Sequence, residues 1–190
     1  ASLLAERRAQ ARAQRAIYSL GEILSSPGPG SPLQSLASLA LELIPGACRC
    51  AIHLTDPQGR LEYARAVAPQ ASGAPLPLLA ASPLALRALQ ERRSLTADDL
   101  APSATLAQGE SEGLAPACAV PIGSEEMPGV MVLYTRGGHR LDTQELAYAT
   151  LIALATGVLL REERLREAIR SEAPSGELIH WSGSVTVRSS

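Results

Sequence analysis

The chain has 190 residues, is 46% hydrophobic and 19% charged, and carries a formal net charge of −2 at pH 7. This length and balance are typical of a globular domain with its own core and exclude a disordered chain. Because only 3% of the residues are aromatic and positive charge is not in excess, we expect neither a nucleic-acid partner nor an anionic membrane partner.

The first predicted element is an amphipathic helix over residues 2–25. Alanine and aliphatic residues recur there at helical spacing, with Arg and Gln between them. Pro27 and its neighbouring glycines end this helix. The alanine-rich stripe indicates a packing surface, either for a second copy of the chain or for the chain's own sheet.

A second helix is predicted to begin after Ser31 and to end before Pro45. Ser31 is a favourable N-cap, and the Pro that follows it suits the first helical position. Gln34 stands where a capping box needs it. The predicted buried stripe consists of Leu36, Leu39, Ala40 and Leu43.

A hairpin is predicted next, with strands over residues 48–55 and 60–67. The sequence Asp-Pro-Gln-Gly between them is typical of a tight turn, since Pro presets φ and Gly tolerates a left-handed exit. If Thr55 pairs with Arg60, alternation divides the side chains between two faces. His53 then lies opposite Glu62 on a polar face that also carries Arg49. The other face is apolar and carries Ile52, Leu54, Leu61 and Tyr63.

The middle of the chain alternates loops with short elements. Residues 68–81 are rich in Pro and Ala and are predicted to form a loop. Ser82, followed by Pro, starts a short helix that ends near Arg92. Residues 101–113, rich in Ser, Gly and Glu, form a second predicted loop. Strands are expected over residues 94–96, 114–122 and 129–135.

The last predicted helix is long and starts with a capping box formed by Asp142 and Glu145. Its first half is almost wholly apolar, which indicates burial against a sheet or another helix. From Arg161 the sequence becomes charged, with an apolar spacing typical of a narrower packing seam. The tail over residues 174–190 alternates in polarity and is either an added edge strand or the start of a neighbouring domain.

Three cysteines, no signal-peptide core and no window that we judge apolar enough for a membrane helix indicate a cytoplasmic chain with free thiols. Cys48, Cys50 and Cys118 are candidates for oxidant sensing, although buried strand cysteines are more often inert packing residues. Cys48 and Cys50 stand two apart on one predicted strand, with parallel side chains. The sequence contains no Cys-x-x-Cys pair, which is the arrangement that favours zinc, so no metal site is predicted.

Three stretches of the sequence resemble the GAF domain, a relative of the PAS fold. The stretch ACRCAIHLTDPQGRL resembles the family's first hairpin. The stretch LALRALQERRSLTADDL resembles its helix and strand that end in paired acidic residues. The region over residues 117–160 resembles its Val-Pro strand, its Gly-containing last strand and its closing helix. Together with the order of elements, the resemblance covers roughly residues 20–170.

The resemblance implies an α+β fold with a central antiparallel sheet. The N- and C-terminal helices would pack on one face, and a short helix with loops would cover the other and enclose a small-molecule pocket. We expect the polar hairpin face to look into that pocket, which makes Arg49, His53 and Glu62 the candidate ligand-binding residues. The expected divisions are a linker helix over 1–30, a sensor domain over 31–160, a signalling-helix extension over 161–173 and a tail over 174–190.

The resemblance implies a regulatory function and not an enzyme. It predicts a small-molecule sensor from a bacterial signalling protein, a homodimer through the terminal helices and a covalently attached output domain. The ligand stays open, because the cyclic-nucleotide signature of the family needs Asn, Lys and Phe, which the chain lacks, and because no Cys precedes a His as in bilin-binding members. Two alternatives remain: a redox enzyme such as free-methionine sulfoxide reductase, which uses three cysteines, and a ligand-free dimerisation module.

Each candidate residue also has a structural interpretation. His53 could contact a ligand, or it could be an exposed strand residue paired with Glu62. Arg49 could grip a carboxylate or phosphate, or it could be a surface arginine. Asp98 and Asp99 could bind a metal, but such a pair more often caps or turns a chain.

Overall fold

A five-stranded antiparallel sheet with the order β2-β1-β5-β4-β3 forms the centre of the described chain. The computed structural model describes residues 2–25, 31–69, 79–100, 113–123 and 128–172. The strands are β1 (Arg49–Thr55), β2 (Leu61–Ala68), β3 (Leu95–Thr96), β4 (Leu114–Ile122) and β5 (Gly129–Arg136). The helices are α1 (Ser2–Ser25), α2 (Pro32–Leu43), α3 (Pro83–Glu91), the 3-10 turn η1 (Ala97–Asp99) and α5 (Thr143–Glu172).

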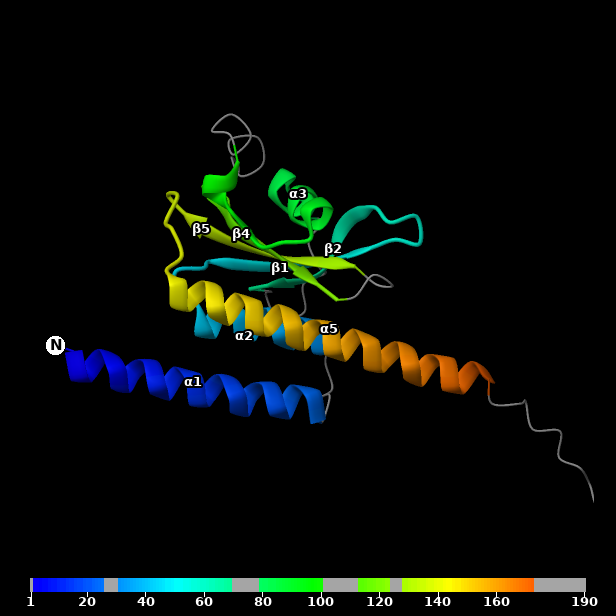
Figure 1. The fold of residues 1–190 in the computed structure, drawn as a ribbon, viewed down its shortest axis with the longest axis horizontal. Coiled ribbons are helices and arrows are strands. Elements are labelled where there is room, and N and C mark those ends of the chain that lie inside the picture. Colours follow the sequence, from blue (N-terminus) through cyan, green and yellow to red (C-terminus); the bar gives the residue numbers. More distant parts are fainter. Residues whose placement is uncertain (1, 26–30, 70–78, 101–112, 124–127, 173–190) are drawn as a thin grey trace, which may run out of the picture.

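The helices divide between the two faces of the sheet as the resemblance implies. Helices α1, α2 and α5 lie together on one face, and α3 lies on the other (Figure 1). α1 and α5 run in the same direction, and α2 runs in the opposite direction (Figure 1). The predicted α+β class and layer arrangement are therefore confirmed. The predicted loop over 101–113 and the tail over 174–190 fall almost wholly outside the described residues.

Of the three predicted helix caps, those of α3 and α5 form as expected. The Ser82 hydroxyl accepts a hydrogen bond from the Ala85 amide at 3.2 Å and caps α3. At α5, the Glu145 amide donates to Asp142 at 2.8 Å, and the Asp142 amide donates to Glu145 at 3.0 Å. These reciprocal bonds form the predicted capping box and satisfy two amides that the helix itself cannot pair.

The capping box predicted for α2 is wrong. Ser31 precedes the helix but makes no side-chain capping bond. Gln34 instead turns toward strand β2, where its amide nitrogen donates to the Val67 carbonyl at 2.7 Å and its oxygen accepts from the Val67 amide at 3.3 Å. Because β2 is an edge strand, its backbone groups lack a strand partner on that side. Gln34 supplies one, and this long-range bond outweighs the local cap.

The predicted hairpin register is also wrong. The pairing of β1 with β2 contains two irregularities, so His53 lies opposite Ala64 and not Glu62, and Thr55 lies opposite Leu61. A pairing shifted by one residue places a side chain on the other face, and Leu61 pairs with Thr55 instead of the predicted Leu54. Leu61 therefore joins the core under α3, and Tyr63 is exposed and bridges Ala80; both were predicted on the helical face. Ile52 and Leu54 face the helices as predicted.

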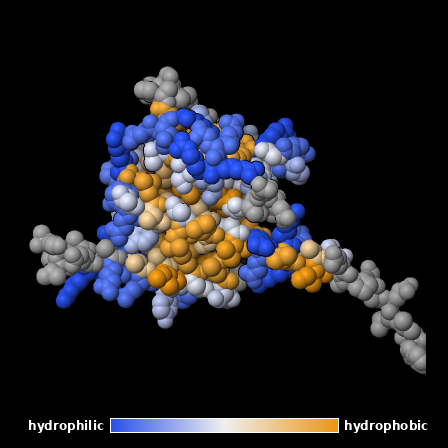
Figure 2. Space-filling view, viewed as in Figure 1, coloured by the Kyte–Doolittle hydropathy of each residue, from blue (hydrophilic) through white to orange (hydrophobic). Residues whose placement is uncertain are grey.

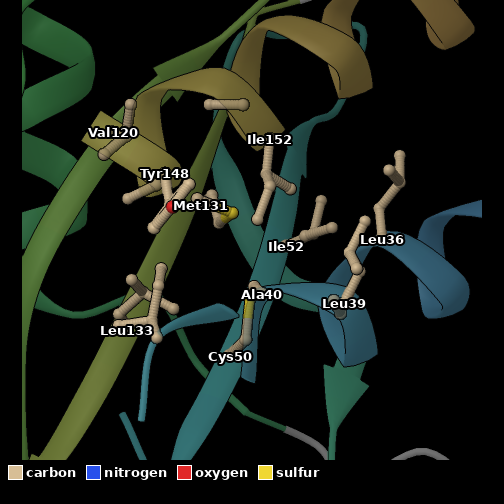
Figure 3. Close-up of a cluster of buried hydrophobic side chains, with 14 of the residues drawn as sticks. Leu36, Leu39, Ala40, Cys50, Ile52, Val120, Met131, Leu133, Tyr148 and Ile152 are labelled. Carbon is tan, nitrogen blue, oxygen red and sulfur yellow. The ribbon is translucent and has the colours of Figure 1, made fainter. Parts of the chain in front are cut away.

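The sheet separates two hydrophobic cores. The larger core lies between the sheet and helices α1, α2 and α5, and Figure 3 shows side chains from α2, α5 and three strands meeting there. The predicted stripe of α2 is buried in it. The smaller core lies between the sheet and α3. Because both faces are covered, β1 and β5 are buried along most of their length.

Helix α5 corrects the expectation that no segment reaches the length and apolarity of a membrane span. Residues 143–171 contain a window with a mean hydropathy of 1.3, which is sufficient for a span by length and composition. Half of that window is buried inside the fold, where Ile152 and Leu160 belong to the larger core. A core helix of a water-soluble domain meets the same criterion, so this apolarity alone does not indicate a membrane.

Candidate functional site

Polar side chains gather on the α3 face of the sheet near the start of α3. Arg49 of β1 is half-buried, and its Cα pairs with that of Tyr134 on β5. Tyr134 is buried and forms a side-chain hydrogen bond with Ser82, the capping residue of α3. Three elements thus bring a guanidinium, a phenol and a hydroxyl to one corner, which we call the α3 corner and define as Arg49, Ser82 and Tyr134.

Burial keeps the Tyr134 phenol protonated. Burial raises its pKa to about 12, although the hydrogen bond with Ser82 and the positive charge of Arg49 both act to lower it. At neutral pH the corner therefore presents a neutral hydroxyl pair beside a permanent positive charge. Such a combination suits a ligand that carries a carboxylate, a phosphate or a carbonyl oxygen.

His53 lies on the same sheet face but deeper in the fold. Its side chain is fully buried, and its cross-strand neighbours are Ala64 on β2 and Val130 on β5. The interpretation of His53 as an exposed strand residue is therefore wrong, as is its predicted pairing with Glu62. Glu62 lies on β2, and its side chain lies outside the described part of the structure. Arg49 and His53 stand four positions apart on β1, about 13 Å along the strand, so these two predicted ligand residues do not meet at one point.

Aliphatic side chains fill the described interface between α3 and the sheet. Leu84, Ala85 and Ala88 of α3 are completely buried against Val130 and Val132 of β5. A hollow of about 270 Å³ opens at the far end of α3, beside Pro121 and Gly129. Among the described residues, a ligand on this face would therefore bind at an end of α3 and not beneath its middle.

A larger hollow, of about 600 Å³, lies at the β3–β4 edge beside the first turn of α5. Its polar lining includes His139, Arg140 and Asp98, and Arg140 pairs with Asp98 at 2.8 Å with both side chains exposed. Asp98 and Asp99, the predicted acidic pair, therefore bind different partners. Asp99 accepts a bond from the Thr96 amide at 2.7 Å and caps η1. The described residues contain no cluster of side chains able to hold a metal.

The three thiols do not form one site. Cys50 and Cys118 both lie in the larger core, on either side of Leu133, with which each pairs across the sheet. Cys48 is half-buried and packs against the other core, so the predicted parallel arrangement of Cys48 and Cys50 is wrong. Burial raises the pKa of the Cys118 thiol to about 12 and raises the pKa of Cys50 as well. Neither buried thiol supplies a thiolate at neutral pH.

Sequence reasoning missed Tyr134 as a site residue and gave Ser82 only a capping role. The one available signal was chemical: Tyr134 is the sole aromatic residue in strand β5. Its contact with Ser82 joins residues 52 positions apart in the chain, and no local pattern encodes such a contact.

Residues 32–161 match the sequence pattern of the GAF domain family. Comparison with curated proteins finds no match. Among solved structures, the chain is similar to the GAF domain of a phosphoenolpyruvate-protein phosphotransferase from Coxiella burnetii, with a TM-score of 0.62 and 17% identity over 84% of this chain and 98% of the other.

Two further structures illustrate the range of proteins that share this fold. One is the GAF domain of a two-component sensor histidine kinase from Bacillus halodurans, with a TM-score of 0.50 and 17% identity over 67% of this chain and 90% of the other. The other is a free methionine-R-sulfoxide reductase from Neisseria meningitidis, with a TM-score of 0.56 and 16% identity over 80% of this chain and 91% of the other. At these identities the likeness establishes the fold alone.

Proposed function

The chain belongs to the GAF domain family, and we propose that it is the small-molecule-sensing, regulatory domain of a bacterial signalling protein. In this proposal the domain is cytoplasmic and is not an enzyme. It forms a homodimer through its terminal helices and passes its ligand state to a covalently attached output domain. Histidine kinases are one class of output domain, as the similar structure from a two-component sensor illustrates.

The observation that carries this proposal is the course of α5. Its first half packs on the sheet, and its backbone closely approaches the turn after β4: a Cβ added to Gly157 would lie 3.0 Å from the Gly123 nitrogen. Residues 163–171, near its end, are all exposed, and this part of the helix extends away from the sheet (Figure 1). A displacement of the sheet at this turn would therefore move a helix that leaves the domain, as a relay requires.

The ligand site that we propose is the α3 corner. Arg49 supplies a positive charge that is partly shielded from water, and Tyr134 supplies a hydroxyl within the same corner. Because α3 begins at Ser82, a ligand there would touch both the sheet and a helix on the face opposite α5. Binding would bias the sheet between two arrangements that α5 reads on the other face.

A ligand-free dimerisation module is the second candidate, and the packing under α3 favours it. Leu84 and Ala88 fill the space in which a sensor of this fold was expected to enclose its ligand. In this alternative the polar groups of the α3 corner serve only to hold α3 in place. Both candidates keep the dimer and differ only in the ligand.

The burial of Cys50 and Cys118 supports the proposal that the chain is not a redox enzyme. Reduction of methionine sulfoxide by a cysteine begins with a thiolate, and the pKa of about 12 at Cys118 leaves almost none at neutral pH. Incubating the protein with free methionine sulfoxide and a dithiol reductant should produce no methionine. Turnover that is lost in the Cys118→Ser variant would overturn this part of the proposal.

Native mass spectrometry of the purified protein tests the ligand and the dimer together. We expect the mass of a dimer plus a bound small molecule, and we expect Arg49→Gln to lose the added mass. Arg65→Gln is the matched control, because Arg65 is an exposed arginine on the neighbouring strand β2. A dimer that carries no added mass, and whose melting temperature no metabolite anion raises, would favour the ligand-free module.

A further inference from the structure

The hollow at the β3–β4 edge combines charged residues of both signs with apolar walls. Its volume is about 600 Å³, and small-molecule sites usually have volumes of about 300–1,000 Å³. Its two sides are η1 and the connection from β5 to α5, which lie at the same end of the sheet (Figure 1). We call it the edge hollow. The apolar residues that define it are Leu100, Ala115, Pro116, Ala117, Leu141 and Leu146.

Small side chains on β4 leave the edge hollow open. In the described part of the chain, β3 pairs with Cys118 and Ala119 of β4, and the chain then turns away as η1. Residues 115–117 of β4 lie beyond that pairing, and they are Ala, Pro and Ala, which fill little of the space beside the strand. Figure 2 shows apolar surface in the middle of this face of the molecule, where β4 and α5 lie, and hydrophilic surface above it. A ligand with an apolar body would therefore find apolar surface at this edge of the sheet.

A small molecule fits the edge hollow better than an added peptide strand. Pro116 has no amide hydrogen that could bond to such a strand. The pairing of β4 with β5 is also irregular between Pro116 and Cys118, and proline and irregular pairing are both typical of edges that resist strand addition. Leu100 packs against the smaller core and Leu141 against the larger one. An apolar group in the hollow would therefore contact both layers of the domain.

Two hydrogen-bonded turns hold the charged residues at the rim of the hollow. On one side, the Asp99 carboxylate accepts from the Thr96 amide at 2.7 Å and from the Thr96 hydroxyl at 3.1 Å, which fixes the turn that carries Asp98. On the other side, the Thr135 hydroxyl donates to a carbonyl of the turn that carries Arg140, at 2.8 Å. The backbone positions of both charges are thus fixed before a ligand binds, which lowers the entropic cost of binding.

The two rim charges decide which ligand charge the hollow accepts. Asp98 would repel an anion and Arg140 would repel a cation, whereas a zwitterion attracts both. The two side chains now pair with each other at 2.8 Å, and an ion pair between exposed side chains contributes little to stability, so a ligand can separate them at small cost. The ring of His139 forms part of the wall and packs against the turn before β1, where a Cβ added to Gly46 would lie 2.8 Å from it.

We propose that the edge hollow is a second ligand site, separate from the α3 corner, for a small zwitterion with an apolar body, such as an apolar α-amino acid. The carboxylate of the ligand binds Arg140, its ammonium group binds Asp98, and its apolar body lies against Leu100 and Leu141. Leu146 of α5 belongs to the same lining. A ligand here therefore contacts the start of α5 directly, whereas a ligand at the α3 corner acts on α5 through the sheet.

Three probes with the same phenyl group and different charges test the proposal. L-Phenylalanine is the zwitterion, 3-phenylpropanoate lacks its ammonium group, and 2-phenylethylamine lacks its carboxylate. Each probe is titrated into the ¹⁵N-labelled 190-residue chain while the amide resonances are followed by NMR. L-Phenylalanine should produce saturable shifts at amides around the hollow, such as those of Ala97, Ala117 and Leu146. The other two probes should bind about tenfold more weakly, because each leaves one rim charge without a partner on the ligand.

Substitutions at the rim supply the second measurement. Arg140→Gln should weaken the binding of L-phenylalanine about tenfold. Arg136→Gln is the matched control, because Arg136 is exposed at the end of β5 and does not belong to the described lining. Asp98→Asn should weaken L-phenylalanine but strengthen 3-phenylpropanoate, since it removes the charge that repels the anion. The melting temperature should stay unchanged in all three variants, because the three side chains are exposed.

Three results would overturn the inference: no saturable shift around the hollow, equal binding of L-phenylalanine and 3-phenylpropanoate, or equal losses in Arg140→Gln and Arg136→Gln. Saturable shifts at the amides of Arg49 and Ser82 instead would place the zwitterion in the α3 corner and would also overturn the second site. A failure of the edge hollow leaves the proposed function in place, because the test of that function follows an added mass that depends on Arg49.

Discussion

Glu145 joins the start of α5 to a turn almost a hundred residues earlier in the chain. One carboxylate oxygen accepts from the Gly46 amide at 2.9 Å, and the other accepts from the Asp142 amide at 3.0 Å. The side chain is only 8% exposed, so water does not readily replace these bonds. We predict that Glu145→Ala is one of the most destabilising single changes that leaves the hydrophobic core intact.

The expected magnitude follows from the groups that lose their partner. Removing the carboxylate leaves the Gly46 and Asp142 amides without an acceptor, and a buried amide in that state costs about 1–3 kcal/mol. Since one of the two amides lies at a helix start that water partly reaches, we expect a total of about 2–4 kcal/mol. Glu145→Gln should cost less, about 1–2 kcal/mol, because one oxygen remains as an acceptor.

Urea unfolding followed by circular dichroism at the helical band measures the effect. The midpoint should fall while the slope of free energy against urea stays unchanged, since the surface exposed on unfolding is the same. Glu163→Ala is the control on the same helix, because it is exposed and should stay within about 0.5 kcal/mol of wild type. A loss below about 1 kcal/mol for Glu145→Ala would refute the argument that these two bonds hold α5 to the turn before β1.

Three further predictions follow from the same contacts and burial. Leu84→Ala should cost about 2–5 kcal/mol in urea unfolding and Leu86→Ala less than about 1, because both leucines lie on α3 but only Leu84 is completely buried. The bonds of Asp56 with Arg60 lower the pKa of its carboxyl below 3.8, so its contribution is present at neutral pH and lost as the pH falls below about 4. The stability difference between wild type and Asp56→Asn should therefore shrink in acid, and a constant difference would contradict the assignment. An aromatic disulfide reagent at pH 8 should modify Cys48 in the native protein and the two buried cysteines only in urea; equal rates for all three would contradict their burial.

Local sequence patterns correctly predicted the helix starts that depend only on neighbouring residues. Ser82 followed by Pro predicts the start of α3, and Asp142 with Glu145 predicts the start of α5, because each cap is complete within four residues. The layer arrangement was implied by the resemblance to the GAF domain. Gln34 shows the limit of such patterns, since its side chain binds the backbone of β2 instead of capping α2.

The site could not be predicted to the same degree because it depends on strand register. Two irregularities between β1 and β2 move Glu62 away from His53 and move Leu61 to the α3 face. Neither irregularity is marked by a Gly or a Pro within the strands, the residues that usually signal one. Arg49 was predicted on the correct face because side chains alternate along β1 in the same way whatever the pairing of β1 with β2. Its neighbour Tyr134 belongs to a strand 85 positions away, so only the folded sheet brings them together.

The apolarity of α5 has a physical explanation that connects the fold with the proposed dimer. One side of the helix, with Ile152 and Leu160, fills the larger core. The opposite side, with Leu154 and Val158, is exposed in the single chain. A helix with two buried sides reaches the hydropathy of a membrane span without a bilayer, provided that both sides are covered by protein. The sheet covers the first side, and the homodimer that we propose would cover the second. If Leu154→Ser and Val158→Ser together improved solubility without weakening any association, this exposed side would have no protein partner, and the explanation would fail.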